Sequence, residues 1–155
     1  MAEQESRRAE DRTEGQLPRY VLPRRSILRG RKKFDRLFAE GKTLRAGDLL
    51  LRWYLVDAEE IEAKGGAAGP LAAFVVAKRY GRAVDRNRVK RLMREAWRLQ
   101  RPGLVEQLDE SARLEIAIVW IGPPAAKGRA KFAPLAANLA GGIDRLVRRI
   151  SRSHA

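Results

Sequence analysis

The sequence contains no cysteine and only one histidine, His154, next to its end. Disulfides, thiol nucleophiles and Cys-based zinc sites are therefore excluded, as are the usual catalytic triads and dyads built on His or Cys. Neither the GxxxxGK[ST] nor the GxGxxG phosphate-binding pattern occurs. The acidic residues are scattered, whereas a metal-dependent nuclease needs convergent carboxylates. We expect no catalytic side chains and no protein-held metal ion.

Long hydrophobic runs are also missing. No stretch reaches the roughly 18 apolar residues of a membrane span, and the start, MAEQESRRAEDRTEG, lacks the apolar region of a secretory signal. We therefore expect a cytoplasmic protein that has no membrane partner. A chain of 155 residues with 45% hydrophobic content is long enough for one domain with a proper core.

Acidic residues are the minority charge. The chain has 33 Lys and Arg against 19 Asp and Glu, a net charge of +14, and its sequence pI is about 11.1. Such a balance favours phosphate-rich partners. Residues 1–25 mix both signs with few apolar groups, which predicts a flexible tail. We expect a single RNA-binding domain over residues 26–150 and a frayed C-terminus over 151–155.

Much of the excess charge lies in residues 78–101, which hold ten Lys and Arg against two acids. From Asp85, a plausible N-cap, apolar residues recur at helical spacing and predict an amphipathic helix that Pro102-Gly103 ends. Its apolar stripe contains Val89, Leu92, Met93, Ala96 and Trp97. Basic side chains collect on the adjoining face, where they could be a solvated surface or could bind a polyanion. The concentration of one sign favours nucleic acid, because the row would otherwise repel itself.

The other segments predict an α+β fold with the order helix, strands, basic helix, strand, helix. Residues 31–40 read as a short helix closed by a left-handed Gly41, and residues 48–56 and 71–79 as strands. Residues 57–62 and 63–70 read as turns, and 104–111 as an acidic connector. A nearly all-apolar run at 114–121 predicts a central strand. A final helix covers 132–150, with a kink or loosening expected at Gly141-Gly142.

Two features suggest contacts to unpaired bases. Phe34 and Phe38 share one face of the first helix, where they could be core residues or could stack on bases. In the strand at 48–56, one face carries Leu50, Arg52 and Tyr54, a mixture of cation and aromatic that suits single-stranded nucleic acid. An ordinary half-exposed strand would show the same pattern.

The segment KRYGRAVDRNRVKRLMREAW resembles the signature of the bacterial ribonuclease P protein component, R-N-R-x-K-R-x-x-R followed by an aromatic residue. The matching positions are Arg86-Asn87-Arg88, Lys90-Arg91 and Arg94, followed by Trp97. Phe34, Phe38 and Gly41 match an upstream F-x-x-x-F-x-x-G pattern of the family. The resemblance covers roughly residues 24–150 and includes the order of the elements.

This resemblance implies a small α/β two-layer protein, a mixed sheet flanked by helices with an unusual left-handed crossover through the basic helix. It also implies an accessory subunit for a catalytic RNA, which uses bound Mg²⁺ to remove the 5′ leader of precursor tRNA. The implied RNA-binding residues are Lys78, Arg79, Arg82, Arg86, Asn87, Arg88, Lys90, Arg91 and Arg94. The implied leader cleft is formed by Phe34, Phe38, Leu50 and Arg52, with Lys78 on its floor; Asn87 could instead help to hold a metal ion.

Other functions fit part of the pattern. A structural RNA-binding protein, such as a ribosomal component, shares the size and charge but would not affect precursor tRNA cleavage. A metal-dependent nuclease would cleave RNA by itself. A helix-turn-helix DNA-binding protein is disfavoured, because apolar strands flank the basic helix and no second short helix precedes it, so we expect no DNA partner.

Overall fold

The computed structural model describes residues 22, 24–65, 68–124 and 130–153. It contains the following elements in chain order: η1 (Arg24–Ser26), α2 (Arg31–Glu40), β1 (Lys42–Ala46), β2 (Leu49–Val56), α3 (Ala58–Lys64), β3 (Gly69–Val75), η2 (Lys78–Tyr80), α4 (Ala83–Gln107), β4 (Arg113–Trp120) and α5 (Phe132–Ser153). Most of the predicted tail and His154 lie outside the described residues. Leu22 packs against the core, and three of the five residues expected to fray belong to α5.

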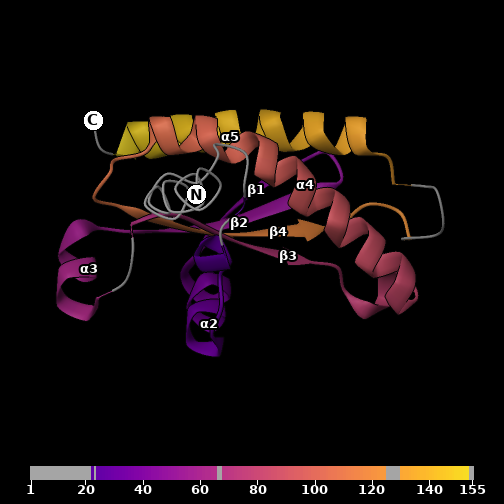
Figure 1. Ribbon diagram of the computed structural model, residues 1–155, viewed down its shortest axis with the longest axis horizontal. Helices are drawn as coiled ribbons and strands as arrows, with labels where there is room; N and C mark the ends of the chain where they lie inside the picture. Colours follow the sequence, from indigo (N-terminus) through magenta and orange to yellow (C-terminus); the bar gives the residue numbers. More distant parts are fainter. Residues whose placement is uncertain (1–21, 23, 66–67, 125–129, 154–155) are drawn as a thin grey trace, which may run out of the picture.

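The four strands form one mixed sheet in the order β1-β2-β4-β3 (Figure 1). β1 pairs with β2 and β2 with β4 in antiparallel fashion, whereas β3 and β4 are parallel. β4 is central and buried except at Val119, which confirms the prediction for the apolar run. The α+β class is likewise confirmed. Because parallel strands need a crossover, α4 links β3 to β4; the left-handed sense of this crossover stays a prediction.

Helices α4 and α5 cover one face of the sheet, and α2 covers part of the other (Figure 1). The predicted stripe of α4 is confirmed, since Val89, Met93, Ala96 and Trp97 are at most 1% exposed. On the face of α2, a smaller cluster joins Leu37 to four residues of β3, β4 and the segment before α2. The α4 face therefore carries the main core, and the α2 face is only partly covered.

The expected end of the basic helix at Pro102-Gly103 is wrong. α4 continues to Gln107, and Leu104 and Leu108 beyond the proline are buried. Pro102 costs one backbone hydrogen bond, but it is itself buried, and the apolar stripe resumes after it. Tertiary packing thus outweighs the local stop signal. Asp85 is not the N-cap either; Arg82 holds that position, and Asp85 lies in the first turn.

Several connections also differ from the sequence-based expectation. The region predicted as turns contains α3, whose N-cap Asp57 accepts a hydrogen bond from the Glu60 amide at 2.8 Å. β1 was not predicted, and it forms a hairpin with β2 through Gly47, whose φ is 59°. The strand predicted to reach residue 79 ends at Val75 and pairs with β4.

Glycine serves close packing rather than the roles we expected. Gly41 is extended, with φ −66°, so the left-handed closure is wrong; a Cβ there would meet the Leu37 carbonyl oxygen. α5 continues as one helix through Gly141-Gly142, so the helix is not interrupted there, and the expected kink stays a prediction. A Cβ on Gly142 would lie 2.8 Å from both Ala46 and Leu51, so this glycine lets the helix approach the sheet closely. Among the described residues, no helix is long and apolar enough to span a bilayer.

Candidate nucleic-acid interface

The helix α4 displays a row of basic residues on its solvent side. Arg91 and Arg94 are exposed together with Asn87, and Lys90 is half-buried beside them. Lys78, Arg79 and Arg82 are exposed at the entry to the helix. Eight of the nine residues predicted to bind RNA therefore carry charge on one continuous stretch of η2 and α4, and the ninth is Asn87.

Among the described residues, almost none of these cations has an acidic partner. In the described part of the chain, the only ion pair of the nine joins Arg82 Nε to Asp85 Oδ2 at 3.3 Å. Two others lie against aromatic rings instead: Arg79 is 5.0 Å from the ring centre of Tyr80, and Arg94 is 5.7 Å from that of Phe74. These contacts orient the guanidinium groups and leave their charge uncompensated.

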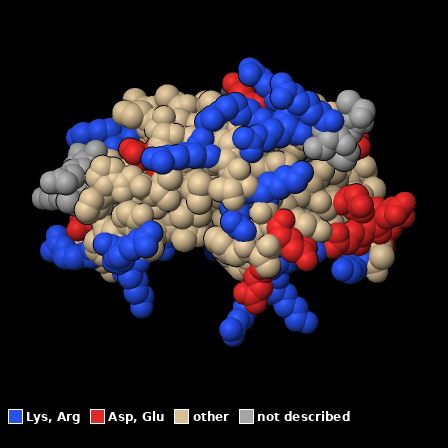
Figure 2. Space-filling model, turned by 180° about the vertical axis from the view of Figure 1, so that it is seen from behind, with Lys and Arg blue, Asp and Glu red and all other residues tan. Residues whose placement is uncertain are grey.

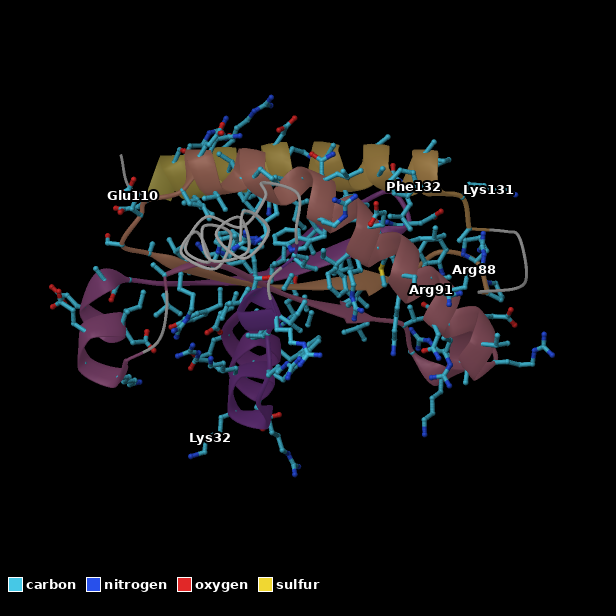
Figure 3. All side chains as sticks on the ribbon, in the orientation of Figure 1. Lys32, Arg88, Arg91, Glu110, Lys131 and Phe132 are labelled. Atoms are coloured by element: carbon cyan, nitrogen blue, oxygen red, sulfur yellow. The ribbon has the colours of Figure 1, made fainter. Side chains whose placement is uncertain are left out.

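Arg88 differs from the rest of the row. It is half-buried and donates from Nη2 to the Ala130 carbonyl at 3.0 Å. Figure 3 shows it near Lys131 and Phe132, with Arg91 about one turn further along α4. Arg88 therefore ties α4 to the segment just before α5 with one donor, and its other donors make no hydrogen bond to a described residue. Arg86 is also half-buried, and its Nε has no hydrogen-bond partner among the described residues.

Arg98 lies one turn beyond Arg94 on α4 and has an acidic partner. Arg98 pairs with Glu95, and the hydrogen bond from Arg98 lowers the pKa of Glu95 below its usual value. The same hydrogen bond raises the pKa of Arg98. Arg98 was not among the predicted RNA-binding residues, and this contact gives it a partner within the chain.

On the opposite face of the sheet, Phe34 and Phe38 stack on each other along α2. Their ring centres are 6.3 Å apart and their planes differ by 11°. Phe34 is half-buried and packs against the smaller core cluster, whereas Phe38 is 44% exposed. The core interpretation therefore fits Phe34. The base-stacking interpretation fits Phe38, whose ring has a surface that a base can reach.

Arg52 closes the C-terminal end of α2. Its Nε donates to the Leu37 carbonyl at 2.9 Å and its Nη2 to the Phe38 carbonyl, while Nη1 donates to Thr43 Oγ1 at 3.1 Å. Its guanidinium also lies 5.6 Å from the ring centre of Phe38. Arg52 therefore satisfies carbonyls that a helix end leaves unpaired, and it holds Phe38 in place.

An apolar strip crosses the sheet beside α2. Leu50, Val119 and Val75 are register partners on β2, β4 and β3, and all three are half-buried. Sequence analysis found Leu50 but missed Val119 and Val75, because strand pairing alone brings them together. Lys78 and η2 follow directly after β3. The strip and the start of the basic row thus lie at the same end of the sheet.

Acidic side chains gather at one end of the molecule. Figure 2 shows the largest acidic group at the end where α3 lies, whereas Lys and Arg side chains are spread over the rest of this face. Among residues 22, 24–65, 68–124 and 130–153, no three His, Cys, Asp or Glu side chains come together as possible metal ligands. The geometry suits a polyanion that is bound by its phosphates, with unpaired bases against the strip.

Known proteins resemble this chain in sequence and in fold. A family model described as Ribonuclease P matches residues 22–150. The ribonuclease P protein component of Chlorobaculum tepidum is 42% identical over 89 residues, which cover 57% of this chain and 56% of that protein. The corresponding protein of Coprothermobacter proteolyticus is 40% identical over 75 residues, covering 48% and 54%. This chain thus matches little more than half the length of these two relatives.

A third relative and two solved structures extend the likeness. The ribonuclease P protein component of Chlorobium phaeobacteroides is 35% identical over 107 residues, 65% of this chain and 72% of that protein. Two structures of the RNase P protein of Staphylococcus aureus match with TM-scores of 0.58 and 0.53. The first is 16% identical and covers 78% of this chain and 94% of the solved one. The second is 15% identical and covers 83% of this chain and 93% of the solved one. Both support the fold. Since the family model matches most of its length, the chain belongs to the ribonuclease P protein family.

Proposed function

We propose that this chain is the protein subunit of a ribonuclease P ribonucleoprotein and assists the 5′ maturation of tRNA. In this proposal, the row on η2 and α4 binds the catalytic RNA, and the strip beside α2 binds the 5′ leader of precursor tRNA. The observation that carries it is the row itself: of its eight cations, only Arg82 has a carboxylate partner in the described chain. Family membership makes RNA the natural source of the missing negative charge.

The protein's contribution is electrostatic and steric. Guanidinium groups would neutralise phosphates of two RNA molecules that otherwise repel each other, which lowers the Mg²⁺ concentration needed for assembly. The RNA would hold the Mg²⁺ and perform the hydrolysis, since the described residues offer no cluster of metal ligands. The leader would lie on Leu50, Val75 and Val119, next to the exposed ring of Phe38. Such a subunit would work in the bacterial cytoplasm, without DNA or membrane partners.

The test is 5′ processing of a precursor tRNA at low Mg²⁺. The assay compares a bacterial ribonuclease P RNA alone, the RNA with this protein, and the protein alone. We expect efficient cleavage only when both are present. Cleavage by the protein alone would indicate a self-sufficient nuclease, and RNA binding without stimulation would favour a structural RNA-binding protein.

A pair of variants links the activity to the row. Arg91→Ala should reduce stimulation, because Arg91 is exposed on α4 and has no acidic partner among the described residues. Arg148→Ala on α5 removes the same charge from another exposed helical position and serves as the control. Equal loss in both variants would show that only overall charge matters, which would contradict α4 as the RNA-binding surface.

A further inference from the structure

An open pocket of about 430 Å³ lies between α2, α3 and the start of β4, away from the basic row. Its charged lining is five basic side chains and one acidic one: Lys32, Lys33, Arg36, Lys64, Arg113 and Glu60. No residue of η2 or α4 contributes to it. The proposed function therefore gives this pocket no role.

Part of this charge is compensated inside the chain. Arg36 donates from Nη2 to both carboxylate oxygens of Glu115, at 3.0 and 3.1 Å, and from Nη1 to Glu60. Burial opposes the charge of Arg36, but these hydrogen bonds and the attraction to Glu115 and Glu60 outweigh it and raise the pKa of Arg36. Lys64 also lies 3.5 Å from Glu60. Two carboxylates thus face five cations, which leaves a local excess of positive charge.

Arg113 is the unusual member of the group. Its side chain is only 7% exposed, and its Nε lies 3.3 Å from Glu115 in an ion pair without hydrogen-bond geometry. Its terminal nitrogens donate to no acceptor among the described residues and are not among the fully buried unsatisfied atoms. Because Arg113 lines the pocket, these donors are available to a ligand there. A guanidinium fork fits an oxyanion with two parallel hydrogen bonds.

Three lysines, Lys32, Lys33 and Lys64, form the rim of the pocket and add positive charge. Lys32 and Lys64 are exposed and Lys33 is half-buried, and Figure 3 shows Lys32 extending from the end of α2 toward the side of α3. The two lysines of α2 lie in its first turn, and no side chain caps that turn, so the helix dipole favours an anion there. Glu59 and Glu62 on α3 do not line the pocket.

We propose that this pocket binds a phosphate-type oxyanion. Arg113 is the buried donor at its base, and Lys32, Lys33 and Lys64 close around the ligand from the rim. Arg36 holds the base together through Glu115 and Glu60. The ligand is either a small free anion or a phosphate of an RNA backbone, since both present the same oxygens.

The test is an NMR titration of the RNA-free protein with inorganic pyrophosphate. The amide of Gly65, which lines the pocket, reports on this site, and the amide of Gly81, between η2 and α4, reports on the basic row. We expect the Gly65 signal to shift and saturate. A Gly65 signal that stays fixed while Gly81 saturates would overturn the proposal.

A double variant gives the matched control. Lys33→Gln with Lys64→Gln should weaken the Gly65 titration about tenfold, at roughly threefold for each charge removed, and leave the Gly81 titration unchanged. Arg91→Gln should do the reverse. Equal weakening of both signals by the lysine variant would indicate a general charge effect and contradict the site.

A single-stranded RNA octamer separates the two sources. If it shifts Gly65 and competes with pyrophosphate, the ligand is a backbone phosphate. If only pyrophosphate shifts Gly65, the ligand is a small anion. The outcome is independent of the processing assay, because no residue of the α4 row lines the pocket.

Discussion

Arginines of two regions lie in opposite electrostatic settings. Around β4, Arg36 and Arg113 are largely buried, and both lie against the fully buried Glu115. Along α4, Arg91 and Arg94 are exposed and have no carboxylate partner in the described chain. A buried cation needs a partner in its own chain, because desolvation without one costs several kcal/mol. An exposed cation is solvated by water and can therefore remain unpaired until an external anion binds. The two regions therefore divide by the partner of their arginines: Arg36 and Arg113 have Glu115 inside the fold, and Arg91 and Arg94 have no carboxylate among the described residues.

The largest effect should come from breaking the buried group. Glu115→Ala leaves Arg36 and Arg113 without their shared carboxylate, and we expect it to lower the free energy of unfolding by about 3–5 kcal/mol. Urea denaturation measures this loss. Glu62→Ala, an exposed acid on α3, is the control and should stay within about 0.5 kcal/mol of the parent. A cost for Glu115→Ala similar to that of the control would refute the division.

The exposed row should show the opposite behaviour. Arg91→Ala should leave stability unchanged and reduce the slope of log affinity for RNA against log salt by roughly one unit. Arg88→Ala should reduce the slope too, but it should also cost about 1 kcal/mol of stability, because it loses the hydrogen bond to the Ala130 carbonyl. Filter binding at several salt concentrations and urea denaturation give the two quantities. An unchanged slope for both variants would exclude α4 as the RNA face.

Phe34 and Phe38 of α2 also differ in burial, and we expect a smaller difference between the effects of their variants. Phe34→Ala should cost about 2 kcal/mol of stability, roughly half the loss for a fully buried ring, because Phe34 packs against the core cluster. Phe38→Ala should cost less stability, but it should weaken binding of leader-bearing precursor tRNA by about 1–3 kcal/mol. Mature tRNA is the control ligand for the reconstituted holoenzyme. Equal weakening for both ligands would return Phe38 to a purely structural role.

Local periodicity was enough to predict the long elements. The stripe of α4, the alternation of β2 and the apolar run of β4 each report burial within one segment, so the sequence carries the information directly. Boundaries were less predictable. Pro102 is a strong local stop signal, and only the burial of Leu104 and Leu108 explains why the helix continues. β1 was missed because it is short and has only two buried residues.

The part of the candidate site that lies on one helix could be predicted from the sequence. The parts formed by several elements could not. The row of α4 follows from spacing along a single helix. The strip of Leu50, Val119 and Val75 depends on strand order and register, and the pocket around Arg113 depends on how α2 and α3 pack against β4. Arg52 shows the same limit: its position on β2 was predicted, but its bonds to the carbonyls of Leu37 and Phe38 require the helix to lie across that strand.

The smallest effect should come from the ion pair between Glu95 and Arg98 on α4. The Arg98 hydrogen bond lowers the pKa of Glu95 in the folded protein below its ordinary value of 4.5. The pair therefore adds stability that is fully present above that value and is lost as the pH falls through the lowered pKa. Urea denaturation of the parent and of Glu95→Gln from pH 7 to pH 3 should give a small difference that is constant at higher pH and shrinks below about pH 4.5. Because both side chains are partly exposed, solvent screens the pair, and a difference as large as that for Glu115→Ala would mean that burial does not separate the two regions.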